Sequence, residues 1–166
     1  MLEIRKATPE DAAQLLAYLN QIGGESDNLL FGANEMQLPL EQEAAFVESI
    51  NRMPTSAMLV GILDGAVVSV ASVQGFGRPR IAHRGNVALS VGKAHWGQGI
   101  GTQMMQALLG FSKGAGLKVL ELEVRSDNAA AIRLYEKMGF RKFGTYRKFF
   151  CIGGQYFDAD YMTLEL

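Results

Sequence analysis

The chain has 166 residues, of which 48% are hydrophobic and 20% are charged, and its formal net charge is −1. This composition is typical of one globular domain spanning residues 1–166, and it excludes an intrinsically disordered chain. The near-neutral charge argues against a nucleic-acid surface, and no apolar run approaches the roughly 20 residues that cross a bilayer.

The termini and the cysteine content indicate where the protein works. Residues 1–11 contain neither the long apolar segment nor the cleavage site of a secretion signal. Cys151 is the one cysteine, which excludes an internal disulfide and fits a reducing compartment. We therefore expect a cytoplasmic protein that binds neither nucleic acid nor membrane.

The first third of the chain predicts a strand and two helices. Residues 2–7 alternate apolar and polar side chains, as a short strand does. A helix follows Thr8, which can cap it, and ends at Gly23-Gly24, and a second helix runs from about Leu40 to Pro54. The apolar stripes of the two helices are expected at Ala12, Leu15, Leu16, Leu19 and Ile22, and at Phe46, Val47, Ile50 and Met53.

The rest of the chain predicts a hairpin and then alternating strands and helices. Asp64-Gly65 between two apolar runs predicts the hairpin, and further strands are expected over 86–91 and 117–124. Helices are expected after the glycines that follow residue 96 and from about Ser126 or Asp127, and two strands around Gly153-Gly154 form the tail. The fold class is therefore α/β (an α+β mixed sheet), with about seven strands, parallel in the middle, and four helices.

Three glycines at alternate positions, Gly97, Gly99 and Gly101, connect the strand at 86–91 to the next helix. The free N–H groups of a helix start carry about half a positive charge, and bare glycines let the backbone close around an anion. We therefore expect a phosphate or pyrophosphate here. No lysine follows Gly101, so the Walker pattern is absent, and Met104 occupies the last place of a dinucleotide fingerprint. Taken alone, the glycines are also compatible with a tight turn that binds nothing.

Together with its neighbours, this stretch resembles the acyl-CoA-binding motif of the GNAT superfamily of N-acetyltransferases. That motif is a strand ending in Val, a four-residue gap, and Gln/Arg-x-x-Gly-x-Gly/Ala opening a helix. Val91 and residues 96–101, WGQGIG, match it in register, with Trp96 where Gln or Arg is usual. A second family motif matches DNAAAIRLYEKMGF at residues 127–140, and residues 153–166 resemble the last hairpin of many members. The resemblance covers roughly Asn86 to Leu166.

The resemblance implies a GNAT-like fold, acetyl-CoA as co-substrate and no metal. In the family, two central strands splay apart, so that the main chain of Leu89, Ser90 and Val91 would bond the pantetheine amides. The remaining cofactor-binding residues that the resemblance implies are Trp96, Gly97, Gln98, Gly99, Ile100, Gly101, Thr102 and Asn128. From the residues alone, an ordinary buried strand and a helix cap at Asn128 are the alternatives.

The resemblance places Tyr135 beside the departing sulfur, with a buried core tyrosine as the alternative. Asn86 stands where many family members carry a glutamate that helps deprotonate the amine, which asparagine cannot do. Glu123 lies on a central strand, where a buried acid is unfavourable unless it is paired or functional. We therefore take Glu123 as the candidate general base, and pairing with Arg125 or Lys148 is the alternative.

The predicted function is direct transfer of an acetyl group from acetyl-CoA to a primary amine of a small molecule, peptide or protein N-terminus. Cys151 has no His or Asp at useful spacing, so we expect a buried small hydrophobe rather than an acyl carrier. Glu25, Asp27 and Glu35, between the first two helices, would favour a cationic acceptor. Two alternatives stay open: a non-catalytic acyl-CoA-binding or sensing module, and an interaction domain that packs into a homodimer.

Overall fold

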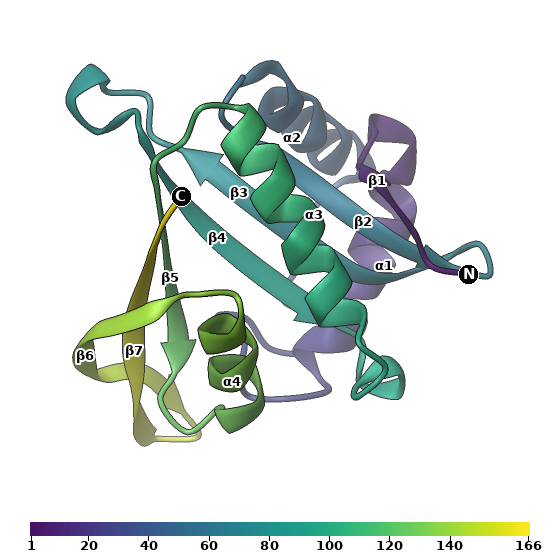
Figure 1. Ribbon diagram of the computed structural model, residues 1–166. Helices are drawn as coiled ribbons and strands as arrows, with labels where there is room; N and C mark the ends of the chain where they lie inside the picture. Colours follow the sequence, from purple (N-terminus) through teal and green to yellow (C-terminus); the bar gives the residue numbers. More distant parts are fainter.

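The computed structural model describes residues 1–166 and contains one mixed β-sheet with helices on both faces (Figure 1). The seven strands and four α-helices are β1 (Glu3–Lys6), α1 (Ala12–Gly23), α2 (Leu40–Arg52), β2 (Ala57–Leu63), β3 (Ala66–Gly75), β4 (Arg84–Val91), α3 (Ile100–Gly114), β5 (Val119–Arg125), α4 (Ala129–Lys137), β6 (Arg141–Ile152) and β7 (Gln155–Glu165). Short 3₁₀ turns lie in the connections: η1 (Pro9–Asp11), η2 (Pro79–Ile81) and η3 (Lys93–His95). None of the helices has the length and apolar character needed to cross a membrane.

The strand order in the sheet is β1-β2-β3-β4-β5-β7-β6. Neighbouring strands are antiparallel everywhere except at β4 and β5, which are parallel. This confirms the predicted seven-stranded mixed sheet that is parallel in its middle. Because a tight turn cannot join parallel strands, the chain crosses from β4 to β5 through α3.

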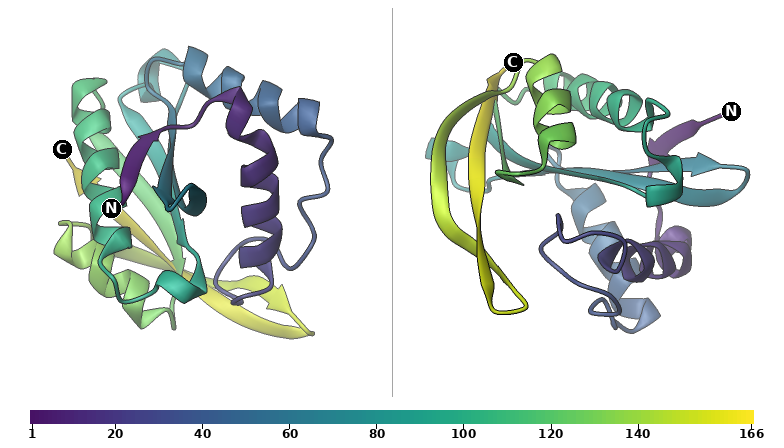
Figure 2. Two further views of the ribbon diagram at one scale, coloured as in Figure 1. Left: turned by 90° about the vertical axis from the view of Figure 1, so that its right-hand side faces the viewer. Right: turned by 90° about the horizontal axis from the view of Figure 1, so that it is seen from below.

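Helices α3 and α4 cover one face of the sheet, and α1 and α2 cover the other (Figures 1 and 2). The larger core lies on the α3 side, where Met104, Met105 and Leu108 are fully buried, as the helical spacing predicts. A smaller core lies on the α1 and α2 side around Leu15 and Val47. Burying each such side chain contributes about 1.5–3 kcal/mol, so the sheet is held from both faces.

Two local signals in the N-terminal half behave as predicted. Asp64 and Gly65 adopt φ angles of 50° and 82°, which fit the type I′ turn that joins the right-twisted strands β2 and β3. The Thr8 N–H donates to the Asp11 carboxylate at 2.8 Å and so begins the first helical segment. Arg5 donates two hydrogen bonds, of 2.7 and 2.8 Å, to the same carboxylate, which lowers the pKa of Asp11 to about 2 and ties β1 to α1.

The buried faces of α1 and α2 differ in part from the predicted stripes. Phe46 is 49% exposed, because α2 turns the face that carries Val47 and Ile50 toward the sheet. In α1, Tyr18 is buried although it is not part of the predicted stripe. A buried tyrosine needs a hydrogen-bond partner for its hydroxyl, and this one finds its partner on β4.

Two predictions for the second half are also corrected. Cys151 is exposed rather than buried, because β6 is the edge strand and one face of it meets solvent. Helix α4 begins at Ala129, one residue later than a cap at Asp127 and two later than a cap at Ser126 would place it, and Asn128 is its cap. Asp127 is instead engaged with Arg125, which removes it from the capping position.

The β6–β7 hairpin curls toward the side of the sheet that carries α1 and α2 (Figure 2). Arg125, at the end of β5, fastens the surrounding segments together. Its guanidinium donates two 2.7 Å hydrogen bonds to Asp127 and one of 3.1 Å to the Asp27 carbonyl in the segment between α1 and α2. It also lies 3.9 Å from the ring centroid of Phe157 on β7. Hairpin, strand and loop therefore meet at one buried cation.

Candidate active site

A gap opens in the middle of the sheet where β4 and β5 separate. The two strands pair only between Arg84–Asn86 and Val119–Glu121, and beyond these residues they diverge (Figure 1). A strand that loses its neighbour keeps main-chain N–H and C=O groups that need other partners. The divergence is the splay that the sequence predicts.

Main-chain groups along β4 alternate in direction. The Gly92 N–H donates to the Val68 carbonyl of β3 at 2.9 Å, so the even-numbered residues of this strand turn their main chain toward β3. The N–H and C=O groups of Leu89 and Val91 therefore face the splay, where a peptide-like ligand can bond them. Ser90, the third residue predicted to offer its main chain, directs that main chain to β3 and can contribute only its side chain.

The three glycines before α3 serve two different purposes. Gly97 and Gly99 have φ angles of 73° and 77°, a left-handed conformation that side chains disfavour. Gly101 is needed for packing, since a Cβ there would lie 3.2 Å from Leu134 and 3.6 Å from Leu89. The first two therefore shape the turn, and the third lets α3 approach α4 and β4 closely.

The start of α3 presents unpaired N–H groups to the mouth of the splay. The first intrahelical hydrogen bond runs from the Gln103 N–H to the Gly99 carbonyl at 3.2 Å. The N–H groups of residues 100–102 precede it and have no partner within the helix. Together with the helix dipole they form a site for the negative charge of a phosphate. The Gln98 side chain points away and donates to the Ala94 carbonyl at 3.1 Å.

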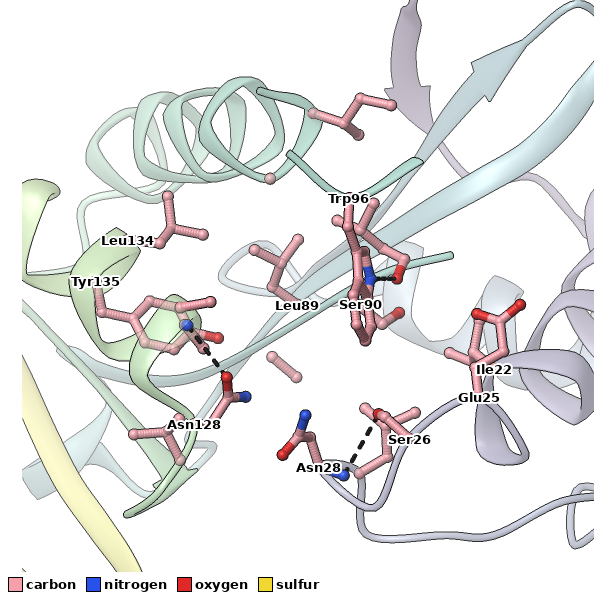
Figure 3. A pocket seen from close by; sticks show the side chains of 18 of the residues that line it. Ile22, Glu25, Ser26, Asn28, Leu89, Ser90, Trp96, Asn128, Leu134 and Tyr135 are labelled. Atoms are coloured by element: carbon pink, nitrogen blue, oxygen red, sulfur yellow. Dashed lines mark hydrogen bonds between the residues drawn. The ribbon is translucent and has the colours of Figure 1, made fainter. Parts of the chain in front are cut away.

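Trp96 closes the end of β4. Its indole N–H donates to the Val91 carbonyl at 2.7 Å, and its ring stands at the centre of the cleft view (Figure 3). This bond occupies the Val91 carbonyl, which is one of the main-chain groups that face the splay. The family motif has Gln or Arg at position 96. In this chain the tryptophan side chain makes its own hydrogen bond, to the end of β4.

Helix α4 brings two predicted residues to the same place. Asn128 caps the helix by accepting the Ala131 N–H at 3.2 Å, which confirms the cap, and it also lines the cleft (Figure 3). Tyr135 is 7% exposed, and its ring packs edge-on against Phe140 at a centroid distance of 5.8 Å. Burial, and then the nearby charge of Glu123, raise the pKa of Tyr135 to about 12. No group of the protein hydrogen-bonds its hydroxyl, which leaves that O–H free to donate.

Glu123 projects from β5 and has no cationic partner. Its carboxylate accepts one hydrogen bond, of 3.2 Å, from the side-chain amide of Asn86 on β4. Arg125 is occupied by Asp127, and the ammonium of Lys148 lies over the Tyr156 ring, so the ion pair that the sequence leaves open is not formed. Asn86 therefore orients the acid of the neighbouring strand.

All these groups surround one cleft of about 510 Å³ (Figure 3). The lining contains every residue that the sequence predicts for the site except Gln98: Leu89, Ser90, Val91, Trp96, Gly97, Gly99, Ile100, Gly101, Thr102, Glu123, Asn128 and Tyr135. Their elements are β4, its connection to α3, the first turn of α3, β5 and α4. Residues that are up to 46 positions apart in the sequence, between 89 and 135, therefore lie around one cleft.

Sequence reasoning found part of the opposite wall of the cleft, since it expected Glu25 and its neighbours between the first two helices to face the acceptor. Residues between 22 and 30, in the α1–α2 segment, and Phe150 of β6 line it. Tyr18 supports this wall by donating from its hydroxyl to the Ser90 hydroxyl at 3.0 Å. His95, in η3, also lines the cleft. No local signal identifies His95 or Phe150 as part of this site, because the segment that they face is far away in the chain.

The three acids expected near the acceptor lie in two places. Glu25 lines the cleft, where its carboxylate accepts the main-chain N–H of Lys93 at 2.6 Å and the Gln21 amide at 2.7 Å. Asp27 and Glu35 line a neighbouring hollow of about 410 Å³ between the α1–α2 segment and the hairpin. Only Glu25 therefore borders the splay itself.

The chain is similar to known acetyltransferases. The model of the acetyltransferase (GNAT) family matches residues 27–140. The chain is 31% identical over 132 residues to an L-amino acid N-acetyltransferase of Escherichia coli, covering 78% of this chain and 81% of that relative. It is 30% identical over 165 residues to an L-methionine sulfoximine/L-methionine sulfone acetyltransferase of Pseudomonas aeruginosa, covering 98% and 94%. A crystal structure of a GNAT-family acetyltransferase from Streptococcus pneumoniae superposes with a TM-score of 0.97 at 27% identity, over 100% of both chains.

A splayed parallel pair with an anion-binding helix start defines an acyltransferase of the acyl-CoA-dependent class, and the family match makes this specific. The chain belongs to the GNAT family of acetyltransferases. It is an N-acetyltransferase that uses acetyl-CoA as its co-substrate, and the predicted fold and function are confirmed at this level.

Proposed function

We propose that the cleft binds acetyl-CoA along β4 and transfers its acetyl group directly to a primary amine that enters from the α1–α2 side. One observation supports this most strongly: Glu123 of β5, a carboxylate without an ion-pair partner, and Tyr135 of α4, a phenol whose O–H has no hydrogen-bond partner, line the same cleft. A base and a hydrogen-bond donor in one cleft are the groups that acyl transfer to an amine requires.

The residues present fit the co-substrate. The N–H groups at residues 100–102 suit a pyrophosphate, and the main chain of Leu89 with the N–H of Val91 suits the amides of a pantetheine arm. Side chains of Asn128 and Leu134 close the other side of the cleft. Acetyl-CoA supplies the acetyl group as an activated thioester, and the protein supplies position and proton transfer. Holding both reactants in attack geometry can lower the barrier by about 7–11 kcal/mol.

Glu123 would act as the general base. An ammonium group must lose a proton before or during attack, and Glu123 is a carboxylate that carries no competing ion pair. Its hydrogen bond from Asn86 holds one oxygen and leaves the other available to the amine or to a water between them. In this chain the acid therefore comes from β5, and the β4 position occupied by an acid in many family members orients it.

Tyr135 would stabilise the leaving sulfur. Since its pKa is about 12, the phenol keeps its proton at neutral pH and can donate a hydrogen bond to the thiolate that forms. Cys151 does not line this cleft but the neighbouring hollow, which favours direct transfer over an acyl-enzyme. The thiolate that leaves then takes up a proton from solvent.

The test replaces Glu123 and, as a matched control, Glu121, which lies on the same face of β5 and is paired with Arg84. With acetyl-CoA and an amine panel, Glu123→Gln should lower kcat by about 10²-fold or more, because general-base catalysis contributes 10²–10⁴-fold. Glu121→Gln should keep kcat within about threefold once folding is verified by melting temperature.

Two results would contradict the proposal. Full turnover by Glu123→Gln would remove the base assigned here. Binding of acetyl-CoA by the wild-type protein without thiol release on any amine would favour the non-catalytic acyl-CoA-binding module instead.

A further inference from the structure

The charges that line the acceptor side of the cleft are all negative. We define the acceptor half as the wall built by residues between 22 and 30 and by Phe150, with Glu123 at the end of β5. Glu25 and Glu123 are its ionisable side chains, and no lysine or arginine lines the cleft. The one imidazole, His95, belongs to η3 between β4 and α3. The neighbouring hollow adds Asp27 and Glu35 and likewise has no basic lining.

Two basic residues bond the segment that builds this wall, and neither of their side chains lines the cleft. Arg125 is 8% exposed and binds Asp127, the Asp27 carbonyl and the Phe157 ring. Lys93 offers Glu25 its main-chain N–H and is exposed as a side chain. An incoming carboxylate therefore finds no guanidinium or ammonium among the side chains that line the cleft.

A free amino acid would bring its own carboxylate into this environment. That carboxylate sits two bonds from the amine, so it must approach Glu123 almost as closely as the amine does. At a separation of about 6 Å and an effective dielectric constant near 20, like charges repel strongly enough to weaken binding more than tenfold. A lone ammonium is attracted by the same acids.

Neutral polar groups in the acceptor half suit an uncharged neighbour of the amine. The Ser26 hydroxyl accepts the Asn28 N–H at 3.4 Å and keeps its own proton to donate, and the Asn28 amide points into the cleft (Figure 3). Leu29, Leu30 and Phe150 supply an apolar wall beside them. Such a surface fits an amide carbonyl and an aliphatic or aromatic body.

We infer that the acceptor is a primary amine with no carboxylate beside it and with an apolar body, in contrast to a free amino acid. This inference rests on the proposed function and names the substrate class of the same site. The recognised chemistry is an ammonium next to a neutral group, whether it comes from a small amine, an amino-acid amide or a peptide N-terminus.

The test compares acceptors that differ only beside the amine. Thiol release from acetyl-CoA is measured with L-leucine, L-leucinamide, isoamylamine and a tripeptide beginning with leucine, and with the corresponding phenylalanine and methionine series. We expect kcat/KM for the amide or the decarboxylated amine to exceed that of the free amino acid by about tenfold or more. The tripeptide arm separates the sources: activity on it and on the amide alone indicates a peptide acceptor, and activity on isoamylamine indicates a small amine.

A charge-adding variant tests the cause of the preference. Leu30 is 69% exposed and lines the cleft, so Leu30→Arg places a cation in the acceptor half without disturbing the core. We expect the amide-to-acid ratio of kcat/KM to fall at least about fivefold. Leu38→Arg adds the same charge at a 43% exposed site outside the cleft and should leave the ratio unchanged.

The outcomes are distinguishable. Equal or faster acetylation of the free amino acids would overturn this inference and leave the proposed function intact. An unchanged ratio in Leu30→Arg would overturn the charge argument. Absence of thiol release with the whole panel, despite acetyl-CoA binding, would contradict the proposed function and this inference together.

Discussion

The hydroxyl of Tyr135 is a hydrogen-bond donor rather than an efficient acid. Its pKa of about 12 lies about 3.5 units above the ordinary value of a thiol, so complete proton transfer to a thiolate is uphill by roughly 5 kcal/mol. A hydrogen bond to the developing charge has no such requirement and is strengthened by the buried surroundings. At the residue scale, burial therefore limits Tyr135 to donating a hydrogen bond and disfavours proton transfer from it.

Replacing Tyr135 by Phe removes the hydroxyl and keeps the ring packed on Phe140. We expect kcat to fall about 10–100-fold, with KM for acetyl-CoA within about twofold, since one hydrogen bond to a developing charge is lost. Steady-state kinetics measures this, with the 56% exposed Tyr146→Phe as the control.

The pH profile provides a second readout for the same residue. Because the pKa of Tyr135 is raised, ionisation of the phenol should cause no loss of wild-type activity below about pH 10. Turnover of Tyr135→Phe at the wild-type rate would show that the leaving sulfur is stabilised elsewhere.

At the scale of an element, α3 combines a strained entrance with an ordinary helical body. Its cap, Gly99, holds a left-handed φ of 77°, whereas Gly110 lies exposed in the helix with open space around it. The entrance turns three N–H groups toward the cleft, and the body buries Met104, Met105 and Leu108 in the larger core. The same helix therefore anchors the fold and presents the phosphate site.

A glycine pair on this helix separates the two roles. Gly99→Ala should destabilise the fold by about 1–2 kcal/mol and weaken acetyl-CoA binding about tenfold or more, because a Cβ disfavours the left-handed cap. Gly110→Ala should stabilise it by about 0.5–1 kcal/mol, because alanine is the better helix former, and leave binding unchanged. Trp96, the one tryptophan, lies in the cleft and allows a fluorescence titration. Equal affinities in the two variants would refute the assigned phosphate site.

At the scale of the whole molecule, the acceptor wall depends on contacts that join the two halves of the chain. Arg125 on β5 holds the Asp27 carbonyl of the α1–α2 segment and stacks on Phe157 of the hairpin. The Glu25 carboxylate binds the Lys93 N–H and so joins the acceptor segment to the turn before α3. Acceptor side and cofactor side are thus braced by a few long-range polar contacts.

Arg125→Lys keeps the charge and loses the fork of donors that reaches both Asp127 and the Asp27 carbonyl. We expect the free energy of unfolding to fall by about 2 kcal/mol, as for the loss of hydrogen bonds to a charged group, and KM for the amine to rise more than KM for acetyl-CoA. Denaturant unfolding and steady-state kinetics measure both. Arg133→Lys, at an exposed position, is the matched control. An unchanged KM for the amine in Arg125→Lys would show that the α1–α2 segment keeps its position without the Arg125 hydrogen bonds.

The local elements follow from local chemistry, and for this reason they could be predicted. The Asp64-Gly65 turn, the Thr8 start of the first helix and the glycines before α3 depend on neighbours within a few residues. The cofactor side of the site is carried by motifs of the same kind, between residues 89 and 135. All but Gln98 of the predicted site residues meet in the cleft.

The tertiary structure alone decided the rest. The register of β4 against β5 determines that Glu123 contacts an asparagine rather than an arginine. The packing of α1 on the sheet determines that Tyr18 binds Ser90, which is 72 positions away in the chain. The exposure of Phe46 and Cys151 could not be predicted, because it depends on which face of a helix is covered and which strand lies at the edge. The sequence by itself determined the glycine turn and helix start to which we assign the acyl-CoA phosphate, since backbone conformation is a local property. The acceptor wall is made by segments far apart in the chain, so only the folded arrangement determined its charge.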